Sequence, residues 1–228
     1  MAGFLELSLK HGTDKVGHHG YQFFYPRYLD SLRDQTFTML EIGYFRGESA
    51  RMWEEYFPHA EIFAVDIESS GKHERHEVIQ ADQSDPEDLK RIADRLGSAR
   101  FIIDDGSHQP THQFETFNFL FRQLLEPGGI YIIEDVECNY WNPESSVYGY
   151  RIGFFNAIEA TTRLIDQINA EFSGRPNDME ISTITYGQNC IIITKQTPEE
   201  RDYFARPYRF QNLIDAPVHG WRGGAGGT

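Results

Sequence analysis

Short apolar runs alternate with helical segments along most of this chain, and this alternation limits its fold more than any other feature. Apolar runs predict strands, and the segments around them predict helices at Glu48–Tyr56, Pro86–Leu96 and His112–Leu125. Strands that alternate with helices form a parallel sheet covered on both faces. The expected strands are Phe37–Ile42, Glu61–Ile67, Glu77–Ala81, Phe101–Asp104, Ile130–Ile133, Ile181–Tyr186 and Cys190–Thr194. The last two read as a hairpin, which would add one antiparallel strand at or near the edge of a mostly parallel, seven-stranded sheet.

The regions outside this alternation suggest how the chain is organised. Residues 3–35 read as mostly helical, with an interruption at the glycine- and histidine-rich segment His11–Tyr21. Arg151–Phe172 predicts a long helix. A chain of 228 residues can bury one substantial core. We therefore expect an N-terminal helical segment or lid over residues 1–35, one α/β domain over 36–205, and a partly flexible tail over 206–228.

Composition narrows the range of partners. The formal net charge of −14 argues against binding to a nucleic-acid backbone or an anionic membrane surface, although it leaves a nucleotide cofactor possible. The sequence contains no run of eighteen apolar residues, which a membrane span requires. Two cysteines are too few for a disulfide framework, which favours a reducing compartment. We expect a cytoplasmic protein without a signal peptide that acts on a small molecule.

Acidic residues gather where two of the predicted strands end. Asp104 and Asp105 end one strand, with His108 three residues later, and Glu134 and Asp135 end the next strand. Ligands of a parallel sheet bind outside the carboxyl ends of its strands. Carboxylates packed together there repel one another unless a cation neutralises them. Oxygen ligands suit Mg²⁺, Ca²⁺ or Mn²⁺ rather than zinc, so the pattern predicts a divalent metal site.

The loop after the first strand predicts a second binding site beside the metal. It reads Glu41-x-Gly43-x-x-x-Gly47, which differs from the glycine pattern that binds a dinucleotide pyrophosphate. The two glycines allow a tight turn and a close approach of the backbone to a ligand. A carboxylate before the first glycine repels phosphate but attracts an amino group.

Two later strand ends complete this second site. Asp66 ends the second strand, where an acidic side chain accepts hydrogen bonds from both ribose hydroxyls. Asp82 and Gln83 follow the third strand and suit the edge of an adenine. A ligand with a ribose, an adenine and an ammonium group but no phosphate is S-adenosylmethionine. The alternative for Asp66 is that it caps the segment that follows it.

These motifs resemble those of class I S-adenosylmethionine-dependent methyltransferases, and more narrowly the metal-dependent sugar O-methyltransferases of macrolides and other glycosylated natural products. The resemblance lies in Gly12–Lys15, Leu40–Gly43, Asp82–Asp85, Ile103–His108 and Ile133–Asp135. It implies a Rossmann-like methyltransferase fold, S-adenosylmethionine as cofactor, and Mg²⁺ or Mn²⁺ as the metal. It also implies a glycoside or deoxysugar as acceptor and a homo-oligomer. The large auxiliary N-terminal domain of the family is not expected here.

The resemblance also assigns roles to individual residues. It implies that Asp105, Glu134 and Asp135 bind the metal, that His108 is the general base, and that Thr13 approaches the cofactor. Successive strand residues point in opposite directions, so Asp104 can face the cofactor while its neighbour faces the metal. A metal bound to two vicinal oxygens lowers the pKa of a sugar hydroxyl and fixes its position. The histidine then accepts the hydroxyl proton.

Several alternatives remain open at this stage. The same carboxylates suit a catechol-type methyltransferase, and a metal-dependent hydrolase without S-adenosylmethionine is a further candidate. His108 is alternatively a loop histidine bonded to a carboxylate, and His112 is the rival base. The remaining histidine groups lack the spacing of a structural zinc site and predict solvated loops. Those groups are His11, His18 and His19, and His73 with His76.

Overall fold

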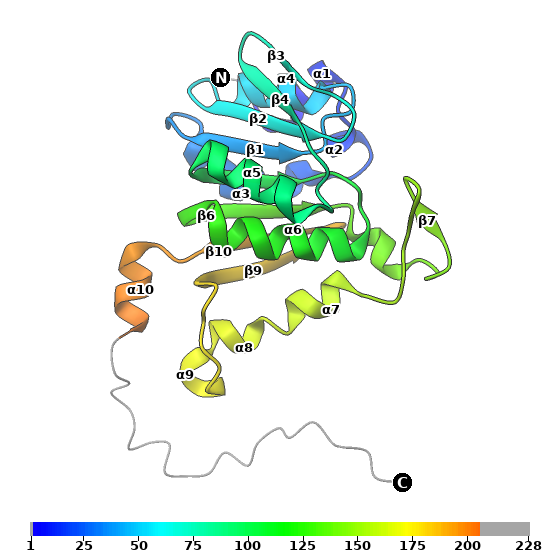
Figure 1. The fold of residues 1–228 in the computed structure, drawn as a ribbon. Coiled ribbons are helices and arrows are strands. Elements are labelled where there is room, and N and C mark those ends of the chain that lie inside the picture. The colour runs from blue at the N-terminus through cyan, green and yellow to red at the C-terminus, as the bar shows by residue number, and fades with distance from the viewer. Residues whose placement is uncertain (1, 206–228) are drawn as a thin grey trace.

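An eight-stranded sheet runs through the computed structural model, which describes residues 2–205 (Figure 1). The strand order is β3-β4-β2-β1-β5-β6-β10-β9. Strands β4, β2, β1, β5 and β6 are parallel, while β10 is antiparallel to both of its neighbours. The bounds are β1 (Thr38–Ile42), β2 (Glu61–Asp66), β3 (Gly71–Lys72), β4 (His76–Gln80), β5 (Ala99–Asp104), β6 (Leu125–Glu134), β9 (Ile181–Gly187) and β10 (Cys190–Lys195).

The mostly parallel sheet and its antiparallel hairpin strand confirm the predicted fold class, but the strand count of seven was too low. The additional strand is β3, an edge strand of two exposed residues that pairs antiparallel with β4. Its sequence, Gly71-Lys72, has no apolar alternation from which a strand is predicted.

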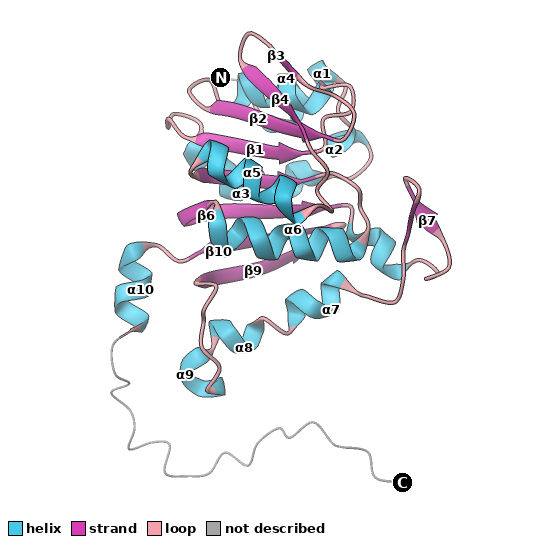
Figure 2. Cartoon of the chain, in the orientation of Figure 1, coloured by secondary structure: helices cyan, strands magenta, loops and turns pink. Residues whose placement is uncertain are grey.

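Helices cover both faces of the sheet (Figures 1 and 2). Each face has its own apolar core. On one face lie α5 (Pro86–Leu96) and α6 (Pro110–Gln123), which bury apolar side chains such as Ile92 and Phe117. On the other face, α1 (Phe4–His11) packs against α4 (Glu48–Tyr56), where Phe4 and Trp53 are in contact at 5.8 Å between ring centroids. The predicted helix Glu48–Tyr56 has the bounds of α4, and Pro86–Leu96 those of α5.

The N-terminal segment forms part of this second core. It comprises α1, α2 (Asp14–Gly17), the 3₁₀ turn η1 (Tyr21–Phe23), α3 (Pro26–Leu29) and the 3₁₀ turn η2 (Asp30–Leu32). Tyr21, Tyr25 and Leu29 are fully buried within the same apolar cluster as Met39 of β1. The segment is therefore packed against the sheet along its length. Its treatment as a separate lid over residues 1–35 stays a prediction.

The region after β6 is less regular than predicted. It contains the 3₁₀ turn η3 (Val136–Tyr140), the small hairpin of β7 (Ser146–Val147) and β8 (Tyr150–Arg151), and the short helices α7 (Ala157–Thr162), α8 (Ile165–Ile168) and α9 (Ala170–Ser173). The long helix predicted within Arg151–Phe172 was wrong. The hydroxyls of Thr161 and Thr162 donate to carbonyls one turn back, and such β-branched residues favour helices weakly. Asn169 then leaves helical geometry, with φ −96° and ψ 38°.

The described chain ends with α10 (Pro198–Phe204), which begins at a capping box formed by Thr197 and Glu200. The predicted flexible tail, residues 206–228, lies outside the described residues. Across residues 2–205, none of the helices is long and apolar enough to cross a membrane.

Candidate functional site

The carboxyl ends of β1 and β5 lie side by side at the point where the strand order reverses. From β1 the chain moves outward through β2 to β4, and then crosses back to β5 and β6 on the other side. In open α/β sheets, ligands bind in the crevice at such a switch point. The residues predicted from the sequence to bind a cofactor or a metal lie at or just after the carboxyl ends of β1, β2, β4, β5 and β6, except Thr13, which precedes α2.

Glu41 of β1 is fully buried beneath the loop that follows it. Its two carboxylate oxygens accept hydrogen bonds from the Ser49 hydroxyl at 2.9 Å and from the Trp53 indole N–H at 3.1 Å. Burial raises the pKa of Glu41 to about 7, although the nearby ammonium of Lys15 lowers it. Both donors belong to α4, so this helix fixes the position of the Glu41 carboxylate.

The two glycines of this loop are required by its packing. Gly43 has φ 95°, and a Cβ atom there would lie 2.1 Å from the carbonyl oxygen of Asp105. Gly47 has φ 71° at the start of α4, where a Cβ atom would lie 2.6 Å from the ring of Tyr44. Any larger residue at Gly43 would push the β1 loop away from the β5 loop, so this glycine sets the spacing of the crevice.

The acidic residues after β2 and β4 accept hydrogen bonds from their own loops. Asp82 accepts from the backbone N–H and the hydroxyl of Ser84. Burial raises the pKa of Asp66, but backbone donors outweigh it, so the net shift is downward. These donors to Asp66 are the N–H groups of Phe45, Glu68 and Ser69. The capping role considered for Asp66 is therefore present, and its contact with a ribose stays a prediction.

Gln83 links the β4 loop to the β5 loop. Its amide donates to Asp104 at 3.1 Å, and its carbonyl oxygen accepts from the backbone N–H of Ser107 at 2.6 Å. Asp104 is fully buried, and this burial raises its pKa to about 7. Both side chains contact protein rather than an open crevice in this structure. Their predicted part in cofactor binding is untested.

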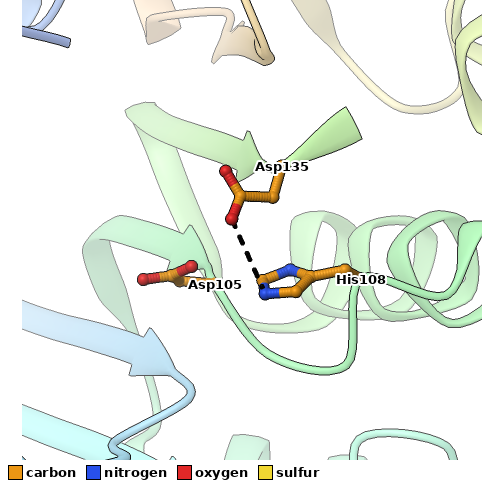
Figure 3. Close-up of side chains that lie close together, drawn as sticks. All are labelled: Asp105, His108 and Asp135. Atoms are coloured by element: carbon orange, nitrogen blue, oxygen red, sulfur yellow. Dashed lines mark ion pairs between the residues drawn. The ribbon is translucent and has the colours of Figure 1, made fainter. Parts of the chain in front are cut away.

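Asp105, His108 and Asp135 come together between β5 and β6 (Figure 3). One ligand atom from each lies within 4.8 Å of the others, which is a spacing that a single metal ion could bridge. His108 Nε2 lies 3.7 Å from Asp135 Oδ2, and within the described chain His108 Nδ1 is buried without a hydrogen-bond partner. His108 and Asp135 have φ angles of 55° and 53°. Such left-handed backbone in residues other than glycine concentrates at functional sites.

A buried lysine with no role assigned from the sequence lies between two of the predicted metal ligands, Asp105 and Glu134. Lys15 is only 1% exposed, and its ammonium lies 2.8 Å from Asp105 and 2.7 Å from Glu134. A third carboxylate, that of Glu41, lies 3.8 Å away. Burial lowers the pKa of Lys15, but these carboxylates raise it well above its usual value. The acidic cluster was expected to need a cation, and in this structure a side chain supplies one.

Two tyrosines of the N-terminal segment also donate to this cluster. Tyr25 donates to Glu134 at 2.6 Å, and Tyr21 donates to Asp135 at 2.9 Å. Their rings stack at 4.8 Å between centroids. Burial raises the pKa of Glu134 well above its usual value. In the sequence, Lys15 was part of the motif Gly12–Lys15, which carried the family resemblance but did not indicate an ion pair.

The other histidines lie outside this group of three, although His19 Nδ1 is 3.3 Å from Asp135 Oδ1, so the solvated loop predicted for His19 was wrong. His112 Nδ1 lies 3.0 Å from the hydroxyl of Ser107, and burial lowers the pKa of this histidine. His11 pairs with Glu55, and His76 pairs with Glu54. Among residues 2–205, Asp105, His108 and Asp135 are the only group of three such side chains spaced to hold a metal.

The β7–β8 hairpin lies over the cluster and brings aromatic side chains to it. The ring of Tyr148 is 5.5 Å from that of His108, and the ring of Tyr150 is 4.7 Å from that of His112. Tyr148 is 74% exposed and has φ 46°. The hairpin therefore presents an open aromatic face next to the candidate base.

Comparison with known proteins shows the family to which the chain is related. No family model matches the sequence. The chain is 33% identical to the 8-demethyl-8-alpha-L-rhamnosyl tetracenomycin-C 2'-O-methyltransferase of Streptomyces olivaceus, over 85% of this chain and 55% of that enzyme. It is 36% identical to the L-olivosyl-oleandolide 3-O-methyltransferase of Streptomyces antibioticus, over 72% of this chain and 45% of that enzyme.

A solved structure gives the same result. The MycE methyltransferase from the mycinamycin pathway, in complex with Mg, SAH and mycinamycin VI, is 31% identical with a TM-score of 0.74. The match covers 87% of this chain and 56% of that one. The chain has the class I methyltransferase fold. Within that class it is a relative of the sugar O-methyltransferases, which confirms the predicted resemblance, and it spans about half the length of these relatives.

Proposed function

We propose that this chain is a Mg²⁺-dependent O-methyltransferase that moves the methyl group of S-adenosylmethionine to a hydroxyl of a vicinal diol. The acceptor is the sugar of a glycosylated natural product or of a nucleotide sugar. The observation that carries the proposal is the grouping of Asp105, His108 and Asp135 at the strand-order switch. The chain is also 33% identical to a sugar O-methyltransferase over 85% of its length, and this supports the proposal.

The donor set fits a hard divalent cation. The proposed ligands are the carboxylates of Asp105, Glu134 and Asp135, and oxygen ligands suit Mg²⁺ and also Mn²⁺. Glu134 already accepts hydrogen bonds from Lys15 and Tyr25. A carboxylate has about four lone-pair sites, so these two bonds leave room for a further ligand contact. When bound, the ion supplies positive charge that lowers the pKa of the acceptor hydroxyl and fixes its position.

His108 is the proposed general base. It accepts the proton of the acceptor hydroxyl while the hydroxyl oxygen bonds to the methyl carbon and the carbon–sulfur bond breaks, which leaves S-adenosylhomocysteine. Asp135 lies 3.7 Å from His108 Nε2, where a carboxylate favours the protonated imidazole that results. The ring of Tyr148 lies 5.5 Å from the imidazole between ring centroids and borders this position.

The cofactor lies, in this proposal, over the carboxyl ends of β1, β2 and β4. Its ammonium group is near Glu41 and Gly43, and its ribose is on Asp66. Thr13 supports this placement, because its buried hydroxyl has no hydrogen-bond partner among residues 2–205 and is available to a ligand. The full proposed set is Thr13, Glu41, Gly43, Gly47, Asp66, Asp82, Gln83 and Asp104.

A mass-shift assay tests the function. The protein is incubated with S-adenosylmethionine and a panel of glycosides and catechols, with Mg²⁺ or with excess EDTA. The proposal predicts a gain of one methyl group on glycosides that carry a vicinal diol, and only with the metal. Transfer to catechols alone would support the catechol-type alternative, and no transfer from S-adenosylmethionine to any acceptor would contradict the proposal.

A further inference from the structure

A cavity of about 460 Å³ lies beside the acidic cluster, on the side away from β1. Its walls come from the N-terminal segment, η3, α7 and the turn between β9 and β10. Its volume is within the range of small-molecule sites. The polar and aromatic residues that line it include His18, His19, Glu137, Tyr140, Tyr186 and Asn189.

Asp135 contacts both the lining of this cavity and the candidate metal site. Its Oδ1 atom accepts from the Asn189 amide at 2.9 Å and lies 3.3 Å from His19 Nδ1, and both of these residues line the cavity. Its Oδ2 atom lies 3.7 Å from His108. Asp135 therefore lies between His108 and two residues of the cavity lining, so the cavity is adjacent to the proposed position of the reacting hydroxyl.

The lining matches a hydroxylated ring. The rings of Tyr140 and Tyr186 are 77% and 46% exposed, and Val136 and Ile191 also line the cavity. Within residues 2–205, the Oε2 atom of Glu137 has no hydrogen-bond partner although it is buried. A carboxylate oxygen can only accept, and a ring hydroxyl can donate to it. Aromatic and apolar side chains with a few polar groups are the usual lining of sites for such amphipathic ligands.

We propose that this cavity binds the second ring of the acceptor, a hydroxylated six-membered ring linked glycosidically to the sugar that is methylated. The inference rests on the proposed function, since it assumes that a sugar hydroxyl lies near His108. Glu137 accepts a hydrogen bond from a hydroxyl of the second ring, and Tyr140 and Tyr186 pack against the faces of that ring. The cavity therefore sets acceptor specificity, while His108 and the acidic residues act on the first ring.

Three rhamnosides of different length test this assignment. They are methyl α-L-rhamnoside, rutinose, in which rhamnose is linked to glucose, and 4-nitrophenyl α-L-rhamnoside, in which an aryl ring replaces the second sugar. Affinities are measured by calorimetry or saturation-transfer NMR on the full chain with S-adenosylhomocysteine and Mg²⁺. We expect rutinose to bind at least about tenfold more tightly than the methyl glycoside, and more tightly than the aryl glycoside.

Two variants locate the effect. Glu137→Gln keeps the size of the side chain and Tyr140→Ala removes an exposed ring, so both should fold. Each should abolish the preference for rutinose and leave the affinities for the methyl glycoside and for S-adenosylhomocysteine unchanged. Tyr148→Ala is the matched control, because its ring lies against His108 and its loss should weaken both glycosides equally.

The outcomes separate this inference from the proposed function. If the glycosides bind but the preference for rutinose is absent or survives both variants, the cavity assignment is overturned while the function stands. A preference for the aryl glycoside that both variants abolish overturns the hydroxylated ring as the ligand class. If none of the three glycosides binds while S-adenosylhomocysteine does, the sugar-acceptor function and this inference fail together.

Discussion

The two halves of the strand-end edge hold their acidic side chains in different ways. In the half formed by β2 and β4, Asp66 and Asp82 accept hydrogen bonds from backbone donors two or three residues away, and Asp66 also accepts from Phe45 of the adjacent β1 loop. In the half formed by β5 and β6, the carboxylates bind donors of the N-terminal segment that are 90 to 119 residues away in the sequence. The first half is organised locally, and the second depends on the whole fold.

This difference determines which carboxylates need a counter-charge. Local backbone donors lower the pKa of Asp66, so that carboxylate is stable on its own. Burial raises the pKa of Glu134 and of Asp135, so these carboxylates need counter-charge from Lys15 or from a bound cation. We therefore expect variants of the β5–β6 half to have the larger effects on activity and stability.

The largest effect is expected for the candidate base. His108→Ala should lower the rate of methyl transfer by roughly 10²–10⁴-fold, the usual effect of losing a positioned base, without changing cofactor affinity. Rate measurements at saturating cofactor, with calorimetry of S-adenosylhomocysteine, check both parts. His112→Ala is the control and should be milder, because His112 contacts Ser107 rather than the cluster. If His112→Ala lowered the rate more than His108→Ala did, the roles assigned to the two histidines would have to be exchanged.

Removal of the buried ammonium should cost the most stability. Lys15→Met leaves Glu134 and Glu41 buried without their counter-charge, so the free energy of unfolding should fall by about 3–5 kcal/mol. Urea denaturation measures this change. Lys10→Met is the matched control, because Lys10 pairs with Glu55 at the surface and its loss should be nearly neutral. Equal effects of the two variants would show that the cluster does not depend on Lys15.

A smaller, pH-dependent effect is expected at Asp104. Burial raises its pKa to about 7, so its contribution to stability is complete below about pH 4 and is lost as the pH rises through 7. In Asp104→Asn the side-chain carbonyl still accepts a hydrogen bond from Gln83, but the side chain carries no charge. Its unfolding free energy relative to wild type should therefore increase by on the order of 2 kcal/mol between pH 5 and pH 8. Denaturation at both pH values without metal measures the change, and a difference of opposite sign would contradict it.

The smallest effect belongs to the β2–β4 half. Asp66→Ala removes an acceptor of the ribose hydroxyls, so affinity for S-adenosylhomocysteine should fall about tenfold, while metal affinity should stay unchanged. Calorimetry measures both constants. Glu68→Ala, an exposed neighbour in the same loop, is the control. Unchanged affinity for the cofactor product in Asp66→Ala would place the ribose elsewhere.

The sequence predicted the features that depend on local pattern. The apolar period gave the strands and the helices Glu48–Tyr56 and Pro86–Leu96, and the acidic strand ends gave the edge at which the site lies. It did not predict Lys15 among the carboxylates, because an ion pair across 119 residues leaves no local signal. The same limit applies to Asn189, which the sequence placed only in a hairpin turn and which contacts Asp135 in the fold.

The requirement for a divalent cation is the most direct test of this account. Methyl transfer from S-adenosylmethionine to a glycoside is measured in metal-free buffer, with excess EDTA, and after Mg²⁺ is restored. The account predicts loss of transfer in EDTA and recovery with Mg²⁺, and neither Asp105→Ala nor Asp135→Ala should recover. Full activity of the wild-type protein in excess EDTA would contradict it, because Lys15 would then be the only cation that the cluster requires.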